Sequence, residues 1–294
     1  MTAMDNRTGK SSASPRPVRH QIVRANADGV AARIRRWILV LSVPLAFFAL
    51  WYAVAEAGIV GRIFIPHPET ILERVTLLWR ELLVAVWVSI QMVAMGAFIG
   101  SVAGIFIGLL FGFSRLAREL FELTLDTIRP VPIFALIPLF VLWFGIGLMP
   151  QVALVALGVF LILSFTTIEA VRNVPRIFVR AALTCGASRI DVYRTVVLPS
   201  IVPEILLGVR FGLIAAWGLD VAAEFSSSSE GLGYFMIVRG QYLDTAGIVL
   251  SVLLFCGCAI IVDRALRYIG RKCMPWNPRV TQQDFITELL GGRG

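Results

Sequence analysis

Few side chains in this 294-residue chain are of the types that perform covalent chemistry. Its only two histidines, His20 and His67, lie far apart and lack the spacing of a metal site or of a histidine-based triad. Residues 8–11, Thr-Gly-Lys-Ser, match the end of a phosphate-binding P-loop, but Met4 stands where that motif needs a glycine, and no strand precedes it. The sequence therefore predicts no catalytic residue, no metal site and no ATP hydrolysis by this chain.

Four charged side chains stand inside apolar stretches or close to their ends: Arg129, Arg210, Asp220 and Glu224. A charge at the bilayer centre costs at least about 2.5–3.5 kcal/mol, so each is a candidate for function. The two arginines could serve a gate or an anion path, or they could anchor helices by extending their long side chains to the membrane surface. The two carboxylates are four residues apart on one helical face, where they could line a water-filled vestibule or face the headgroup water as a pair.

Glycine recurs at every fourth residue between positions 96 and 112. The five residues are Gly96, Gly100, Gly104, Gly108 and Gly112. On a helix this spacing places all five along one stripe, where a second backbone can approach closely. The stripe predicts a helix-packing surface, or a groove along which two helices slide as a transporter changes conformation.

Membrane-spanning helices must position these residues. The chain is 57% hydrophobic and 16% charged, whereas soluble domains average about 45–50% apolar and about 25% charged. Its longest uncharged run, Pro130 to Ile168, is too long for one span of about 20 residues, and the cluster 145–150 supplies turn residues for a reversal. We therefore expect an all-α membrane protein with six transmembrane helices. Their expected ranges are 37–55, 84–113, 119–143, 150–169, 203–224 and 245–268.

The distribution of charge predicts the orientation of the chain. With six spans, both termini and the segments 114–118 and 171–202 share one side, which holds 21 Lys and Arg residues against 4 on the other. Positive charge marks the cytoplasmic side, so both termini should be cytoplasmic. The net charge of +8 follows from this bias and does not indicate nucleic-acid binding. We divide the chain into a disordered basic tail (1–36), a first span with an outer surface helix (37–83), a core domain (84–270) and a cytoplasmic tail (271–294).

A polar segment, residues 180–210, interrupts the apolar runs on the predicted cytoplasmic side. Ala181 and Ala182 are followed by Gly186 and, further on, by Leu198-Pro199. This order resembles the EAA loop of binding-protein-dependent ABC importer permeases, which reads Glu-Ala-Ala, three residues, Gly, about nine residues, Ile, one residue and Leu-Pro. Further stretches are similar to the sulfonate/taurine/nitrate branch of that family. They are Gly186-Ala187-Ser188, Arg129-Pro-Val-Pro, Trp143-Phe-Gly-Ile-Gly147, Trp217, Ala222-Ala223-Glu224 and Gly231-Leu-Gly233.

The segment 176–200 should form two short helices that bend at Gly186, because a sharp bend favours a residue that tolerates positive φ. Leu198-Pro199 should end the second helix before the fifth span begins. One residue departs from the family pattern, because Arg180 stands where the motif has Glu. The charge contact at that position must therefore differ in this chain.

The resemblance implies the fold of a type I ABC importer transmembrane domain in a bacterial inner membrane, with no enzymatic activity of its own. It implies a second copy of the chain, two ATPase subunits that bind the ATP and Mg, and an extracytoplasmic substrate-binding protein. The implied ATPase-docking residues are Arg180, Ala181, Ala182, Gly186, Ala187, Ser188, Leu198 and Pro199. The candidate residues of the translocation path or gate are Arg129, Arg210, Trp217, Asp220 and Glu224.

The substrate remains open between a sulfonate-, taurine- or nitrate-like anion and a neutral heterocyclic precursor. Two other classes of protein are alternatives. An ion-coupled secondary transporter would work alone and would bury acidic residues in mid-span, and the spans here are nearly free of them. A membrane-embedded enzyme would cluster His, Asp or Ser near one membrane face, which two remote histidines do not favour.

Overall fold

The computed structural model describes residues 18–58, 61, 63–128 and 130–274. The chain divides into two compact units, Met1–Ile65 and Pro66–Gly294. All regular elements in the described residues are helices, as the all-α class predicts. In the same residues, four helices are long and apolar enough to cross a membrane, and two shorter apolar segments are Leu41–Ala57 and Ile133–Phe144. The predicted count of six spans therefore stays a prediction.

The first unit contains the 40-residue helix α1 (Val18–Ala57). Residues 18–36 belong to this helix, whereas the sequence analysis places them in a disordered tail; residues 1–17 lie outside the described part. Alanine and arginine, both strong helix formers, supply much of this stretch, and Pro44 is the only proline inside α1. Apolar side chains such as Val43 and Phe47 are exposed on the helix, as expected for a segment that faces lipid.

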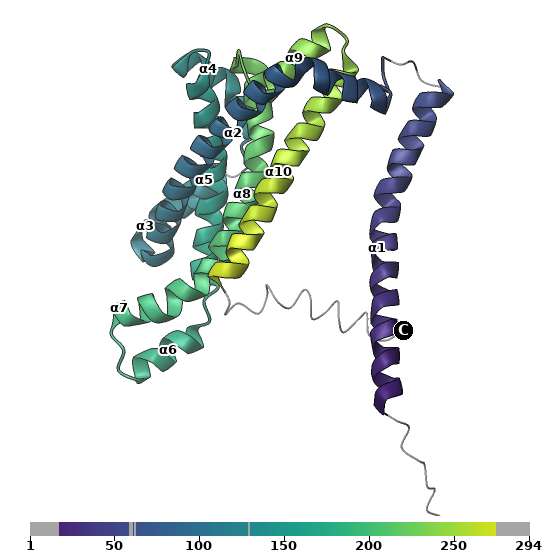
Figure 1. Cartoon of the computed structure of the whole chain (residues 1–294). Coiled ribbons are helices and arrows are strands. Elements are labelled where there is room, and N and C mark those ends of the chain that lie inside the picture. The colour runs from purple at the N-terminus through teal and green to yellow at the C-terminus, as the bar shows by residue number, and fades with distance from the viewer. Residues whose placement is uncertain (1–17, 59–60, 62, 129, 275–294) are drawn as a thin grey trace, which may run out of the picture. The chain divides into compact units, whose positions relative to one another are not determined.

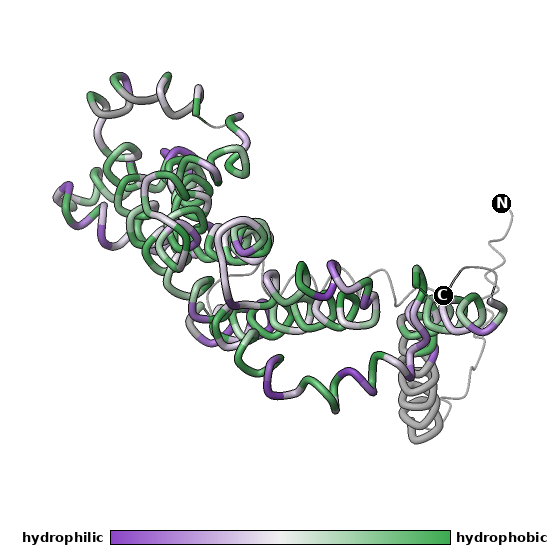
Figure 2. The backbone as a smooth tube through the Cα atoms, turned by 90° about the horizontal axis from the view of Figure 1, so that it is seen from above, coloured by the Kyte–Doolittle hydropathy of each residue, from purple (hydrophilic) through white to green (hydrophobic). Residues whose placement is uncertain are grey.

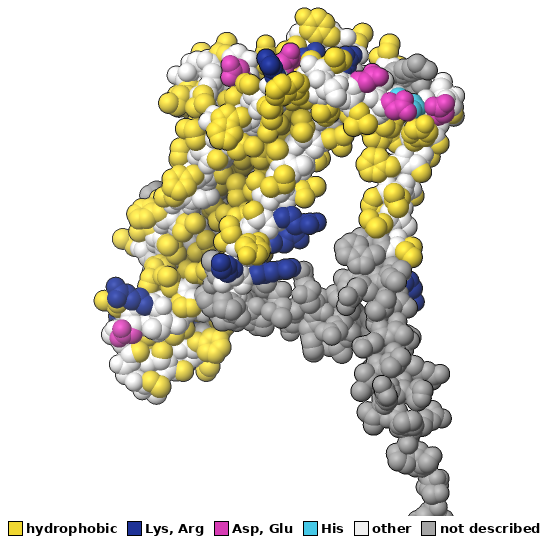
Figure 3. All heavy atoms as spheres, viewed as in Figure 1, with side chains coloured by type: hydrophobic (Ala, Val, Ile, Leu, Met, Phe, Trp, Pro, Cys, Tyr) yellow, Lys and Arg dark blue, Asp and Glu magenta, His cyan; other side chains and the backbone are white. Residues whose placement is uncertain are grey.

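Four long helices form the body of the second unit: α2 (Pro68–Phe113), α5 (Leu148–Arg172), α8 (Leu198–Ser227) and α10 (Thr245–Cys273) (Figure 1). The middle helix is α5, which packs against both α2 and α8 and fully buries Val155, Val159 and Leu163. Figure 2 shows that apolar residues predominate along these helices, and Figure 3 shows hydrophobic side chains over the visible face of this unit. The unit is thus apolar both inside and on the surface that a bilayer would cover.

The predicted surface helix and second span form one continuous helix. Pro68 occupies the first turn of α2, where its missing N–H costs nothing, and the helix runs unbroken to Phe113. In Figure 1 the first turns of α2 cross one end of the second unit beneath α9 (Leu232–Gln241), before the helix descends into the bundle. We call this end the α9 end. The boundary predicted between residues 83 and 84 is therefore not a break in the helix.

The third predicted helix, 119–143, is wrong as a single element. The chain forms α3 (Arg115–Ile128), then a short 3₁₀ helix η1 (Ile133–Leu136) and α4 (Ile137–Phe144). Pro130 and Pro132 explain the interruption, because proline lacks the N–H for the helical ladder and also disfavours helical geometry in the residue before it. The chain then reverses where the sequence predicts, since Gly145 and Gly147 adopt positive φ values of 78° and 138° immediately before α5.

The polar segment forms a helical hairpin at the end opposite to α9. It consists of α6 (Arg176–Thr184) and α7 (Arg189–Val192), and Figure 1 shows both projecting beyond the long helices. A π-helical turn, η2 (Tyr193–Val197), joins α7 to α8 without a break. Leu198-Pro199 therefore does not end the second helix, contrary to the expectation. The wider π turn lets the Leu198 amide donate to the Tyr193 carbonyl and accommodates the ring of Pro199 in the first turn of α8.

Candidate functional site

The hairpin α6–α7 bends at Gly186, which has the positive φ of 84° that the sequence analysis expects of it. Ser188 then begins α7 with a capping box. Its hydroxyl accepts from the Asp191 amide at 3.2 Å, and its own amide donates to the Asp191 carboxylate at 3.1 Å. A small core under the hairpin holds it in place. Its buried members are Ala170, Val192, Val197 and Ile201, and Ala182 and Ala187 pack against them.

The outer surface of the hairpin exposes large apolar side chains beyond the long apolar helices. The exposed fractions are 68% for Ile177, 56% for Phe178 and 64% for Ile190. Arg180, Ala181, Gly186 and Ser188 are also exposed, Leu198 is 38% exposed and Pro199 is half-buried. The sequence reasoning did not single out the three large side chains. The sequence signal that could have found them is a large apolar residue in a short polar helix, on the face that points away from the core under the hairpin.

The glycine stripe of α2 lies against α5. A Cβ on Gly96 would come within 2.7 Å of the Val155 Cβ, and a Cβ on Gly104 within 2.7 Å of the Phe160 carbonyl oxygen. The residues of α5 that approach the stripe also recur at every fourth position. They are Val155, Val159, Leu163, Thr167 and Val171, which face Gly96, Gly100, Gly104, Gly108 and Gly112 in that order. A ridge of side chains on α5 thus fills a groove of glycines on α2.

The carboxylate of Glu224, a residue of α8, lies at the start of α9. It is 1% exposed and accepts hydrogen bonds from the backbone amides of Gly233 and Tyr234, which are first-turn donors of that helix. Ser89 of α2 donates to Oε1 of Glu224 at 2.6 Å and accepts from the Leu232 amide at 2.9 Å. A Cβ on Gly231 would collide with this carboxylate. The carboxylate therefore fixes α9, and sequence reasoning missed Ser89 because its partner is distant along the chain.

Asp220 and Trp217 are buried one turn apart on α8. Asp220 is 0% exposed, and neither of its carboxylate oxygens has a hydrogen-bond partner among the described residues. The Trp217 ring packs edge-on against Phe255 of α10, with ring centroids 6.1 Å apart. Both side chains are inside the protein, so neither faces headgroup water in the single chain. The water-filled vestibule expected for Asp220 and Glu224 stays a prediction. No group of three or more His, Cys, Asp or Glu among the described residues could hold a metal ion.

Arg210 forms an ion pair with Asp263 of α10, and Arg267, one turn further on α10, pairs with the same carboxylate. The Arg210 side chain is 30% exposed and that of Asp263 is 13% exposed. This partner gives Arg210 a role in joining α8 to α10, which the sequence did not predict. Arg129, the other arginine of the candidate path, lies outside the described residues.

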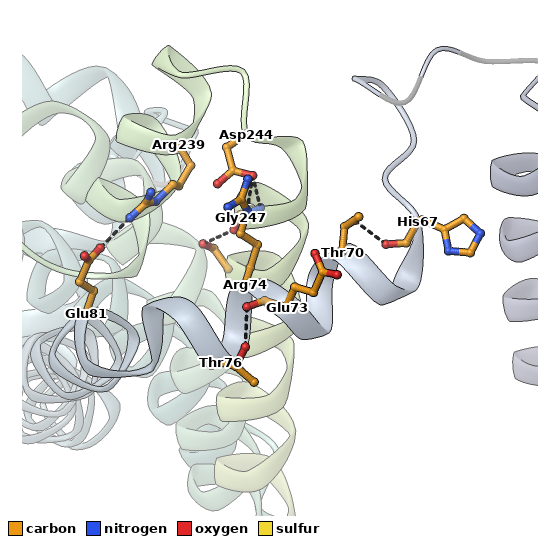
Figure 4. Close-up of polar contacts among 10 residues, drawn as sticks. His67, Thr70, Glu73, Arg74, Thr76, Glu81, Arg239, Asp244 and Gly247 are labelled. Atoms are coloured by element: carbon orange, nitrogen blue, oxygen red, sulfur yellow. Dashed lines mark hydrogen bonds and ion pairs between the residues drawn. The ribbon is translucent and has the colours of Figure 1, made fainter.

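Ion pairs join the start of α2 to α9 and α10 at the α9 end (Figure 4). Arg74 pairs with Asp244 at 3.1 Å, and the same carboxylate caps α10 by accepting from the Gly247 amide at 3.2 Å. Arg239 of α9 pairs with Glu81 at 2.6 Å. In Figure 3 charged side chains gather at this end of the unit. The described residues of the second unit thus form an apolar bundle with an ion-paired α9 end and an exposed apolar hairpin at the other end.

Known proteins resemble this chain in sequence and in fold. The taurine transport system permease protein TauC of Escherichia coli (strain K12) is 30% identical over 262 residues, which cover 83% of this chain and 94% of that protein. SsuC of Bacillus subtilis (strain 168), named for aliphatic sulfonates transport, is 30% identical over 263 residues, covering 86% and 94%. A chain of the inward-facing MetNI methionine ABC transporter superposes with a TM-score of 0.52 at 21% identity, covering 64% of this chain and 97% of that chain.

The match to MetNI gives the fold, the transmembrane domain of a type I ABC importer. The family match extends over residues 100–274, more than half of the chain, and includes α5, the hairpin, α8, α9 and all of α10. It is a family of transport subunits in the inner membrane, whose ATPase is a separate subunit. The chain belongs to the family of binding-protein-dependent transport system inner membrane components.

Proposed function

We propose that this chain forms the translocation path of an ATP-driven importer for a small sulfonate- or taurine-like anion. The proposal for the substrate rests on relatives that are named for taurine and aliphatic sulfonates and that align over nearly their whole length. A nitrate-like anion belongs to the same class of small oxyanions. A neutral heterocyclic precursor is the alternative substrate, because the family and the fold are those of importers in general and do not by themselves determine the solute.

The hairpin is the proposed docking site of the ATPase. The observation that carries this proposal is the exposure of Ile177, Phe178 and Ile190 on a hairpin that lies beyond the long apolar helices. Exposed apolar side chains that no lipid covers favour burial against another protein. The bend at Gly186 and the capping box of Ser188 support the role, since they keep the surface rigid. Arg180 is exposed beside this surface and would meet the ATPase with a positive charge.

The hairpin end is the cytoplasmic end in this proposal, and both termini are cytoplasmic. Five Lys and Arg residues lie between 171 and 202, and Arg271 and Lys272 stand in the last turn of α10. Positive residues are retained on the cytoplasmic side, which supports this orientation. ATP and Mg would then be bound by the docked ATPase subunits, and this chain would need no cofactor of its own.

Two copies of the chain, two ATPase subunits and one extracytoplasmic binding protein make up the proposed assembly. The description of the family as binding-protein-dependent supports the last partner. The α9 end would receive the binding protein, and the second copy would complete the path. Trp217, Glu224 and Arg210 would act from within the bundle by positioning α8 and α9, because each contacts a neighbouring helix. Asp220 is buried without a hydrogen-bond partner among the described residues and remains the proposed path residue.

A second candidate function is ion-coupled transport by the chain alone. The observation that favours it is the burial of two carboxylates, Asp220 and Glu224, within α8. Glu224 already accepts from Ser89 and from the α9 amides, so its oxygens serve the structure. Asp220 is the residue that such a carrier would use.

Reconstitution separates the two functions. The permease would be placed in proteoliposomes with its cognate ATPase and binding protein, and uptake of taurine and of hexanesulfonate would be measured. The proposal expects uptake only when ATP and both partner proteins are present. Uptake by the permease alone under an imposed proton or sodium gradient, abolished by Asp220→Asn, would contradict the importer and support the carrier.

A further inference from the structure

A cavity of about 450 Å³ opens at the α9 end of the second unit, between α2, α9 and the segment that precedes α9. Most of its lining is apolar. The residues that matter here are Val84 and Ala85 of α2, and Phe235 and Val238 of α9. Four charged residues also line it: Arg80, Glu81, Glu230 and Arg239. Pockets that bind small molecules measure about 300–1,000 Å³ and combine an apolar lining with a few polar groups, so the cavity has the size and character of a ligand site.

The fold keeps the two walls of this cavity in place. At one end of α9, Ser89 of α2 accepts from the Leu232 amide at 2.9 Å, and Glu224 caps the same helix end. At the other end, Arg239 of α9 pairs with Glu81 of α2 at 2.6 Å (Figure 4). The Arg239 guanidinium also lies 4.6 Å from the centre of the Phe235 ring. Both ends of α9 are thus bound to α2, and the cavity is formed before any ligand arrives.

The arginines of the lining differ in their partners. Arg239 is committed to Glu81. Arg80 is exposed and lies 5.1 Å from the centre of the Trp79 ring, and no carboxylate among the described residues pairs with it. Stacking on an aromatic ring leaves the in-plane N–H groups of a guanidinium able to donate to an anion. Arg80, which has no carboxylate partner among the described residues, therefore lies beside an apolar cavity.

We propose that this cavity binds a small amphiphilic monoanion, with its acidic head at Arg80 and its apolar chain against Ala85 and Phe235. Ala85 and Phe235 line the cavity and are only 5% and 7% exposed, so the surrounding side chains hold this part of the lining in place. Glu230 lines the same cavity and repels a second negative charge, which favours a sulfonate over a dianion such as sulfate. The inference rests on the proposed function, because it gives the permease its own contact with the solute that the importer carries.

Binding is tested on the permease–ATPase complex in nanodiscs of phosphatidylcholine, with hexanesulfonate as the probe and equilibrium dialysis as the readout. Val84→Trp fills the cavity from a position that is 55% exposed, so the fold tolerates the ring. Leu83→Trp is the matched control, since the neighbouring Leu83 is 60% exposed and does not line the cavity. Arg80→Gln removes the cation, and Arg264→Gln removes the same charge at the opposite end of the unit.

The proposal expects saturable binding of one hexanesulfonate per permease chain. Arg80→Gln should weaken it at least about ten-fold, as the loss of one charged hydrogen bond does. Val84→Trp should weaken it at least as much, because the indole ring takes the space of the apolar chain. Leu83→Trp and Arg264→Gln should bind as the unchanged protein does, and sulfate should not compete.

Three results would overturn the proposal. They are no saturable binding, binding that Val84→Trp leaves unchanged, and a cavity that takes phosphatidylglycerol instead, seen as displacement of the sulfonate when that lipid is added to the discs. The proposed function fails differently, because the ATPase would then not co-purify with the permease. ATP-driven uptake without sulfonate binding to the permease would refute the proposed binding site and leave the proposed importer function standing.

Discussion

The Ser89 hydroxyl donates a 2.6 Å hydrogen bond to Oε1 of Glu224, 135 residues further along the chain. The same hydroxyl accepts from the Leu232 amide at 2.9 Å. One buried hydroxyl therefore joins α2, the end of α8 and the start of α9, and both its donor and its acceptor functions are used inside the protein. The position of α9, and with it the shape of the α9 end, depends on this contact.

Replacement of Ser89 by alanine should destabilise the protein. Ser89→Ala leaves the Leu232 amide and one Glu224 oxygen without their buried partner, which costs about 1–3 kcal/mol. Thermal unfolding of the purified protein in detergent measures the change as a lower Tm. Ser226→Ala is the control, because Ser226 is an exposed serine in the last turn of α8, close to Glu224 in the chain. Equal Tm values for the two variants would show that the Ser89 contact does not hold α9.

Replacing a glycine of the stripe by alanine should destabilise the protein, whereas replacing a glycine outside the stripe should not. A Cβ on Gly104 would lie 2.7 Å from the Phe160 carbonyl oxygen, so Gly104→Ala must push α2 away from α5 and should cost about 1–3 kcal/mol. A Cβ on Gly218 of α8 would meet no atom within 4 Å, so Gly218→Ala should be neutral or stabilise the helix by about 0.5–1 kcal/mol. Unfolding in detergent compares them, and a stable Gly104→Ala protein would rule out close packing at the stripe.

Arg210 and Asp263 should behave as a pair. Asp263→Ala or Arg210→Ala alone leaves the other charge without its main partner at the α8–α10 contact, and each should lower Tm. The exchange Arg210→Asp with Asp263→Arg restores opposite charges, although Arg267 then faces a second cation. A double-mutant cycle measures the coupling. Additive effects of the two alanine variants would mean that the ion pair does not join these helices.

Asp220 should lower the free energy of unfolding of the isolated protein. Helices α5 and α8 run antiparallel, and Gly212 of α8 faces Val159 of α5. Asp220 and Gln151 each lie about two turns from that contact, so they are at the same level in the bundle. Asp220 is fully buried and both of its oxygens lack a partner among the described residues. Asp220→Leu should therefore raise the free energy of unfolding by about 1–3 kcal/mol.

Urea unfolding in detergent, with Asp220→Asn as the isosteric comparison, measures this change. A leucine variant that is less stable than the asparagine variant would contradict the prediction, because it would mean that Asp220 makes polar contacts worth more than its burial costs.

Much of the bundle is predictable from the sequence because it follows from local patterns. Apolar runs gave the long helices, the glycine spacing marked the face of α2 that meets α5, and Gly186 marked the bend of the hairpin. Each of these signals lies within one continuous stretch of chain. A membrane environment strengthens them, since backbone groups in lipid must pair within a helix.

Features that depend on distant partners or on proline geometry were not predictable in this way. The break between α3 and α4 follows from Pro130 and Pro132. The sequence analysis expects one helix there because the stretch 119–143 is long enough and apolar enough to cross a membrane. Pro199 continues a helix because a π turn accommodates its ring, which composition does not reveal. The role of Ser89 depends on the packing of α9 against α2. The pairing of Arg210 with Asp263 requires contact between α8 and α10, and the two residues are 53 positions apart.

The affinity of the purified cognate ATPase for the permease tests the central claim most directly. Phe178, 56% exposed on the hairpin, is replaced by glutamate, and Tyr242, 76% exposed at the α9 end, receives the same change as a control. Loss of one buried aromatic contact costs about 1.5–3 kcal/mol, so Phe178→Glu should weaken ATPase binding at least about ten-fold while Tyr242→Glu leaves it unchanged. Equal ATPase affinities for the unchanged protein and Phe178→Glu would contradict docking at this hairpin.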